Sequence, residues 1–121
     1  MRRFELRRTY RGKDITAGVI QTPHGVQVTL FGGDRPHIGA VAIVDPEGNR
    51  TLTEFPGHRE GAVCDAWAAA CAAAGVCPAV VTAGIHYDGI SREEIAAVVA
   101  QTEALLHAVL KELCEGRETR F

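Results

Sequence analysis

The spacing of apolar residues changes part-way along the chain, and this change constrains the fold more than any other feature. From Phe4 to Phe55, apolar and polar residues tend to alternate, which is the period of a β-strand. From Arg59 onward, apolar residues recur every three or four positions, which is the period of a helix. A strand-rich first half followed by a helix-rich second half predicts an α+β fold.

Five strands are predicted before the first helix. Turn-forming residues at 12–14, 23–25 and 45–49 separate short strand-like segments. Short strands joined by tight turns favour an antiparallel meander. The run Ile38–Val44 is apolar throughout except for one glycine, which predicts a central strand covered on both faces.

Two helices are expected in the second half, with one short strand between them. The first helix is predicted over Arg59–Ala74 and the strand over Ala79–Ile85. Ser91 and Glu94 have the spacing of a capping box, which predicts that a second helix begins there. We therefore expect one α+β domain over residues 1–121. It has a mostly antiparallel sheet of about six strands with two helices packed on one face, in the order strand meander, helix, strand, helix.

Composition and charge argue against several classes of partner. The net charge of −2 argues against a surface that binds nucleic acid generally. The sequence has no uninterrupted apolar stretch that would predict a membrane span. No secretory signal is recognised at the N-terminus, and none of the four cysteines forms a C-x-x-C pair. We therefore expect reduced thiols in a cytoplasmic protein with no nucleic-acid or membrane partner.

Three histidines occupy similar settings, each close to a glycine and to the predicted start or end of a strand. Glycine lets backbone approach a ligand closely, and loops at strand ends often carry binding sites. We therefore expect the three segments to form one shared site. Its candidate cofactor-binding residues are His37, Gly39, Gly57, His58, Arg59, Glu60, His86 and Asp88.

The segment at 57–60 also predicts an anion site, because His58 and Arg59 stand at the start of the first predicted helix. The first amides of a helix have no internal partner, and the helix dipole favours negative charge there. The guanidinium of Arg59 adds donors suited to phosphate or carboxylate. The structural alternative is a salt bridge from Arg59 to Glu60 or Asp65.

A divalent metal ion is a second possible ligand of the histidine segments. His86 and Asp88 are two residues apart, so on a strand their side chains share one face. Together with His37 and His58 they would supply enough ligands for zinc or another divalent ion. The spacing adds no further support, because the sequence has no H-E-x-x-H pair.

The sequence contains few of the motifs that would indicate an enzyme. It contains no G-x-S-x-G elbow, no P-loop and no G-x-G-x-x-G segment. Its only serine, Ser91, is already explained as a helix cap. Acid/base chemistry by histidine stays open, whereas His24 and His107 are expected to be structural or solvated.

Three ordered segments resemble the LpdD family. They are Pro36–Ala42 (PHIGAVA), Phe55–Glu60 (FPGHRE) and Ala83–Ile90 (AGIHYDGI), followed by Glu93-Glu94-Ile95. The resemblance covers nearly the whole chain and implies a fold like that of proteasome assembly chaperones, and a homodimer. It further implies a non-catalytic protein that binds reduced prenylated FMN. Such a protein helps to deliver this cofactor to an apo UbiD-type decarboxylase of gallate or related aromatic acids.

Two other functions stay open beside the cofactor-binding chaperone. One is a small metal-dependent or histidine acid/base enzyme built on His37, His58, His86 and Asp88. The other is an assembly module with no small ligand. Its alanine-rich helix around Trp67 would pack against a partner.

Overall fold

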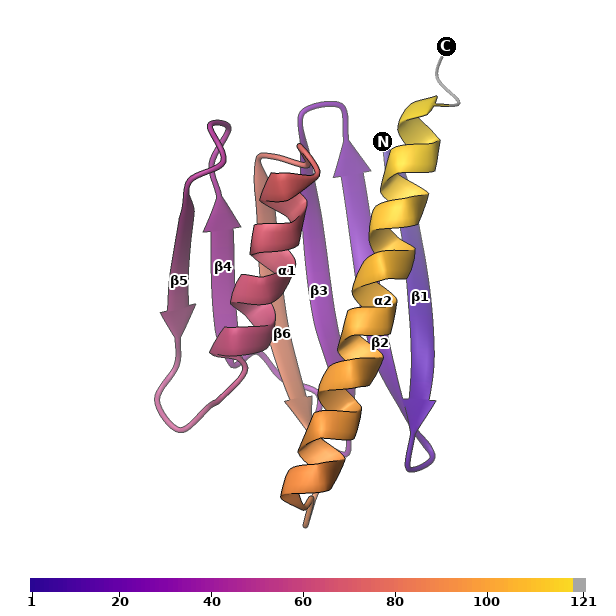
Figure 1. The fold of residues 1–121 in the computed structure, drawn as a ribbon, viewed down its shortest axis with the longest axis vertical. Coiled ribbons are helices and arrows are strands. Elements are labelled where there is room, and N and C mark those ends of the chain that lie inside the picture. The colour runs from indigo at the N-terminus through magenta and orange to yellow at the C-terminus, as the bar shows by residue number, and fades with distance from the viewer. Residues whose placement is uncertain (119–121) are drawn as a thin grey trace.

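The computed structural model describes residues 1–118 of the chain and contains six strands and two helices (Figure 1). The strands are β1 (Arg2–Tyr10), β2 (Lys13–Thr22), β3 (Gly25–Gly33), β4 (Ala40–Val44), β5 (Arg50–Glu54) and β6 (Ala79–His86). The helices are α1 (Gly61–Ala73), between β5 and β6, and α2 (Arg92–Glu118), after β6. The α+β prediction and the order of the elements are confirmed.

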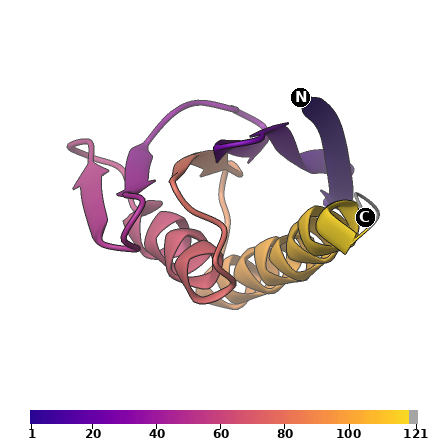
Figure 2. The same ribbon diagram turned by 90° about the horizontal axis from the view of Figure 1, so that it is seen from above.

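All six strands form one sheet in the order β1-β2-β3-β6-β4-β5. Four of the five neighbouring pairs are antiparallel, and β3 and β6 are parallel. Both helices pack on one face of this sheet: α1 against β4, β5 and β6, and α2 against β1 and β2. Figure 2 shows the sheet arching over the helices, with its opposite face uncovered.

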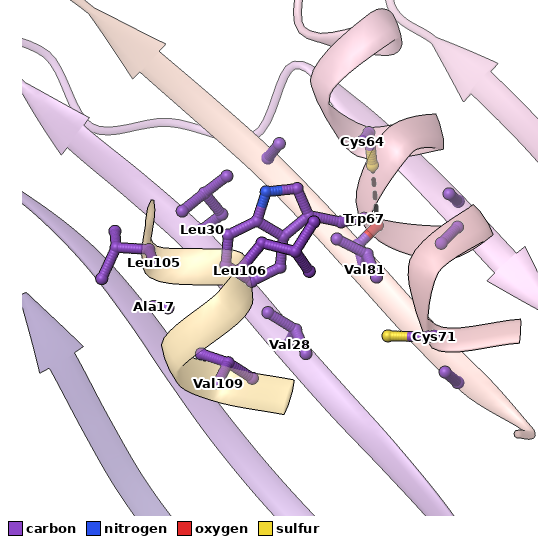
Figure 3. Packing of buried hydrophobic residues seen from close by; sticks show 14 of the residues in the cluster. Ala17, Val28, Leu30, Cys64, Trp67, Cys71, Val81, Leu105, Leu106 and Val109 are labelled. Atoms are coloured by element: carbon purple, nitrogen blue, oxygen red, sulfur yellow. Dashed lines mark hydrogen bonds between the residues drawn. The ribbon is translucent and has the colours of Figure 1, made fainter. Parts of the chain in front are cut away.

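The core lies between the sheet and the two helices, and Trp67 stands near its centre (Figure 3). Alternate residues of β2 and β3, among them Ala17, Val28 and Leu30, point into the core because side chains alternate across a strand. The apolar stripe of α2 meets them from the other side. Cys64, on α1, is fully buried, and its thiol donates a hydrogen bond to the carbonyl oxygen of Val81 at 3.0 Å.

The meander prediction is correct for β1–β3 and for β4–β5, but wrong between β3 and β4. β6 is inserted between those two strands, although it follows both of them in the sequence. The prediction that β4 is a central strand covered on both faces is also wrong. It is the second strand from the edge, and Ile43, on the face away from the helices, is 47% exposed.

Residues 34–39 cross the carboxyl end of β6 to connect β3 with β4. The amides of Asp34 and Gly39 donate hydrogen bonds to carbonyl oxygens of His86 and Ala83, at 2.7 and 2.8 Å. Gly84 makes this crossing possible, because a Cβ atom there would lie 1.7 Å from the carbonyl oxygen of His37. The inserted strand and the glycine therefore bring His37 to the end of β6.

The capping box predicted at the start of α2 is confirmed. The amide of Glu94 donates to the Ser91 hydroxyl, and the amide of Ser91 donates to the Glu94 carboxylate, both at 3.2 Å. The hydrogen bond that the Glu94 carboxylate accepts from the Ser91 amide, together with the nearby Arg11 guanidinium, holds the pKa of Glu94 below its usual range. None of the helices in residues 1–118 has an apolar stretch long enough to span a membrane.

Candidate functional site

A cavity of about 560 Å³ lies where the carboxyl end of β6 meets the first turns of α1 and α2. Both helices begin at this end of the molecule, at the lower side of Figure 1. The polar residues that line the cavity are Arg35, His37, His58, Arg59, Glu60, His86 and Thr102. Its apolar wall consists of Val63, Ala83, Ile85, Tyr87, Ile90, Ile95, Val98 and Val99. The cavity therefore combines an apolar wall with a group of basic and acidic side chains.

His37, His58 and Glu60 converge at one side of the cavity. Nε2 of His37 lies 2.9 Å from a carboxylate oxygen of Glu60 and 3.1 Å from Nδ1 of His58. The other nitrogen of His37, Nδ1, lies 2.8 Å from the carbonyl oxygen of Arg35. The crossing segment supplies one of these three side chains, and the loop between β5 and α1 supplies the other two.

Gly39 supports this cluster from behind rather than lining the cavity. A Cβ atom at Gly39 would lie 2.3 Å from Oε2 of Glu60 and 3.0 Å from the Cβ atom of His58. The same Oε2 accepts a hydrogen bond from the amide of Arg59 at 3.0 Å. The Glu60 side chain is 13% exposed, so packing and hydrogen bonding both fix its orientation.

The start of α1 differs from the predicted phosphate site. The helix begins at Gly61, and the amide of this residue donates to the carboxylate of Glu54 at 2.7 Å. The first amide of the helix is therefore taken by an acidic side chain of the same chain and is not available to a phosphate. The dipole of α1 stabilises this carboxylate instead.

The guanidinium of Arg59 forms no ion pair or hydrogen bond with residues 1–115, whose side chains the structure describes, although it lines the cavity. The alternative salt bridges from Arg59 are not formed. Asp65 pairs with Arg50 at 3.3 Å, whereas the carboxylate of Glu60 faces His37. Arg59 thus supplies an unpaired positive charge at the edge of the cavity.

His86 lines the same cavity but belongs to a separate group of residues. Its Nε2 lies 2.9 Å from the carboxylate of Asp88, and Nε of Arg35 lies 3.5 Å from the same oxygen. The amide of Asp88 donates to the carboxylate of Asp34 at 2.9 Å, which ties this turn to the crossing segment. The predicted metal set of His37, His58, His86 and Asp88 is therefore divided. Glu60, rather than His86 and Asp88, lies beside His37 and His58.

Six of the eight candidate residues identified in the sequence line the cavity. These are His37, Gly57, His58, Arg59, Glu60 and His86, while Gly39 and Asp88 lie behind the lining and contact it. His24 and His107 are exposed and lie outside the cavity, as predicted. Sequence reasoning missed Arg35 and the apolar wall. Ile95 belongs to the apolar stripe of α2 but is 47% exposed, unlike the buried residues of that stripe. Its exposure marks the cavity, and the sequence pattern alone does not reveal it.

Tyr87 closes the cavity against the body of the sheet. Its ring is 3% exposed and packs edge-on against Tyr10 at a centroid distance of 5.5 Å. Its hydroxyl donates to the carbonyl oxygen of Lys13 at 3.1 Å. Burial, with a smaller effect from the nearby Asp34 and Asp14 carboxylates, raises the pKa of this phenol. Tyr87 therefore serves as a neutral structural wall.

The cavity has the general features of a small-molecule binding site. Its volume falls within the roughly 300–1,000 Å³ range of small-molecule sites, which are mainly apolar with a few oriented polar groups. A family model described as the prenylated flavin chaperone LpdD-like domain matches residues 9–114 of the chain. No curated protein sequence matches it. The matched region includes every residue that lines the cavity.

Proposed function

The chain belongs to the family of prenylated flavin chaperone LpdD-like domains, and we propose that it binds reduced prenylated FMN in the cavity between β6 and the two helix starts. The observation that carries this proposal is the cavity itself, whose lining combines an apolar wall with the Arg59 guanidinium. The protein holds and protects the cofactor without catalysing a reaction on it. The redox and covalent chemistry belongs to the flavin.

The lining residues divide into two parts that suit the two ends of such a ligand. Ile85, Ile90, Ile95 and Val98 form the apolar surface that takes the ring system and its prenyl-derived part out of water. Arg59 is the proposed partner of the phosphate, because guanidinium groups bind phosphate oxygens through two parallel hydrogen bonds.

The other candidate residues position the polar part of the ligand. His37, His58, Glu60 and His86 offer hydrogen bonds from one side of the cavity, and Gly57 borders it without a side chain. Gly39 and Asp88 act through their neighbours, Glu60 and His86. These eight residues constitute the proposed cofactor-binding set.

We propose that the bound cofactor is passed to an apo UbiD-type aromatic acid decarboxylase. The exposure of Ile95 supports this step, because a ligand against that side chain is reached from the surface without unfolding of the core. The step is tested by reconstituting apo-decarboxylase with limiting reduced prenylated FMN. We expect faster activation when the cofactor is supplied on this protein than when it is supplied free.

A homodimer is the proposed assembly, formed through the sheet face that the helices leave uncovered. Phe31, Val41, Ile43 and Val80 alternate with core residues and therefore share that face. Ile43 and Val80 stand opposite each other on neighbouring strands, so they form a continuous apolar area. Sedimentation of the unmodified chain and of Ile43→Lys tests this assembly, with a monomeric variant as the expected result.

Ligand binding is tested by titrating the purified protein with reduced prenylated FMN under anaerobic conditions, using the flavin spectrum as readout. Arg59→Ala removes charge-assisted hydrogen bonds worth about 1.5–3 kcal/mol, so we expect affinity to fall roughly 10- to 100-fold. Arg3→Ala is the matched control, because Arg3 is exposed on a strand outside the cavity and carries the same charge.

An unchanged affinity in the Arg59 variant would contradict the assignment of the phosphate. Absence of any spectral or thermal shift in the unmodified protein would contradict the proposal as a whole. Titration with FMN that carries no prenyl-derived ring provides the third comparison. Equal affinity for the two flavins would show that the apolar wall does not recognise the added ring.

A further inference from the structure

We propose that His37, His58 and Glu60 form a binding site for one divalent transition-metal ion. A ring nitrogen of His37, a ring nitrogen of His58 and a carboxylate oxygen of Glu60 all lie within 4.8 Å of one another. No other group of three metal-ligating side chains comes as close among residues 1–115. The inference does not depend on the identity of the cavity's organic ligand.

The hydrogen bond of His37 to backbone determines which of its ring nitrogens faces the cluster as an acceptor. The carbonyl oxygen of Arg35 can only accept, so Nδ1 of His37 carries a proton and donates it over 2.8 Å. In the neutral ring, Nε2 then presents a lone pair. A backbone carbonyl that orients a ligating histidine in this way is typical of metal sites.

Three electron-pair donors therefore point toward one small space. Nε2 of His37 lies 2.9 Å from the Glu60 carboxylate, which is acceptor-only when ionised, and 3.1 Å from Nδ1 of His58. Nδ1 of His58 is 3.8 Å from the other carboxylate oxygen, too far for a hydrogen bond. A proton on Nδ1 of His58 can be donated to only one of the neighbouring acceptors. A metal ion can bind both imidazole nitrogens and the carboxylate at once.

The spacing between the three groups matches the edge of a coordination polyhedron. With metal–ligand bonds of about 2.0–2.2 Å in a tetrahedral arrangement, neighbouring ligand atoms stand about 3.3–3.6 Å apart. Nε2 of His37 lies slightly closer than this to both neighbours, at 2.9 Å from one carboxylate oxygen and 3.1 Å from Nδ1 of His58. Nδ1 of His58 lies slightly beyond this range, at 3.8 Å from the other carboxylate oxygen, so small side-chain rotations complete the geometry. Packing of Gly39 against Glu60 and the hydrogen bond from the Arg59 amide hold the carboxylate in place beforehand.

The ligand set indicates which ions the site takes. Two imidazoles and one carboxylate suit zinc, iron(II), cobalt or manganese, whereas calcium and magnesium prefer sites built from oxygen alone. Three protein ligands leave at least one coordination position unfilled. Because all three residues line the cavity, this position opens toward it and can take an oxygen atom of a bound ligand.

The test uses metal alone on the purified full chain after treatment with a chelator. Cobalt(II) is titrated in while its visible absorption is followed, and zinc is titrated by calorimetry. We expect one ion per chain. His37→Gln, His58→Gln and Glu60→Gln should each weaken binding by more than about 100-fold, because even outer-shell partners contribute roughly 10- to 100-fold. Circular dichroism checks that each variant is folded, and Glu60→Gln, which keeps the side-chain shape, decides the test if a histidine variant does not fold.

The matched control replaces both exposed histidines outside the cavity, His24→Gln and His107→Gln, and should bind cobalt as the unmodified chain does. The proposal is overturned if no ion binds at one per chain, if Glu60→Gln binds with unchanged affinity, or if the control loses binding. Prenylated FMN is titrated separately. Cobalt binding without flavin binding would count against the proposed function and leave the metal site standing.

Discussion

Replacing Gly84 with alanine should separate the effect of the strand crossing from the rest of the fold. Gly84 lies on β6 directly beneath the segment that carries His37. The added Cβ atom would lie 1.7 Å from the carbonyl oxygen and 2.2 Å from the carbonyl carbon of His37. Both atoms belong to backbone, so no rotation of a side chain can relieve the contact.

The size of the effect follows from these distances. Ordinary contact begins near 3.4 Å, so the carbonyl oxygen must move by about 1.7 Å or β6 must shift by a similar amount. Overpacking of this kind costs about 1–3 kcal/mol, partly offset by the roughly 0.5–1 kcal/mol that alanine gains over glycine in a strand. His37 would also leave its position beside His58 and Glu60, so cobalt binding should be lost.

Gly18→Ala is the matched control for this variant. Gly18 lies on β2 on the same face of the sheet, and the nearest atom to its added Cβ is 3.9 Å away. Its substitution should leave stability unchanged or raise it slightly. The assay is thermal unfolding followed by circular dichroism, with about 4 °C expected per kcal/mol for a chain of this length. Equal melting temperatures for the two variants, with cobalt binding retained in both, would refute the reasoning about the crossing.

Three further predictions concern the core and the helix cap. Trp67→Ala should lower the free energy of unfolding in urea by about 3–5 kcal/mol, because the 1%-exposed indole fills the space between the sheet and the helices. Burial raises the pKa of the Cys64 and Cys71 thiols from 9.0 to about 11, so the native state holds these protons more tightly than the unfolded state. Their contribution to stability should therefore be complete below pH 9 and decline between pH 9 and about 11 in urea titrations, less so in the double alanine variant. Ser91→Ala should lower stability by about 1 kcal/mol through loss of the α2 cap, whereas Ser91→Asp, which can also cap, should retain most of it.

Two of the basic residues near the start of the chain form contacts with α2. Arg2 pairs with Glu112 on α2 at 2.5 Å, and Arg8 donates a hydrogen bond to Gln101 on the same helix. Both arginines share the face of β1 that carries Phe4 and Leu6, because residues two apart on a strand point the same way. These contacts with α2 occupy guanidinium groups that the sequence alone leaves without a partner.

The eight candidate residues were found from local patterns, but their division into groups was not. Glycine beside histidine at strand ends predicts that a segment can approach a ligand, and six of the candidates line one cavity. The partner of His37 is Glu60 rather than Asp88, a choice that depends on how two loops meet. Local sequence patterns cannot predict which loops come into contact. Residues 37 and 60 are connected along the chain by the crossing segment and the β4–β5 hairpin, and only the fold brings their side chains together.

The sequence alone determined the elements, their order and the α+β class. These depend on local properties: the alternation of apolar residues in the first half, the helical apolar stripe of α2 and the Ser91 cap. The insertion of β6 between β3 and β4 was decided only by the tertiary structure. The parallel strands β3 and β6 are connected by all of the chain between Gly33 and Ala79, so no local turn determines that they pair. The free energy that favours this pairing comes from burial of both strands beneath Trp67 and the two helices. The same insertion carries His37 across Gly84 to His58 and Glu60, because the connection from β3 to β4 has to pass around the end of the strand between them.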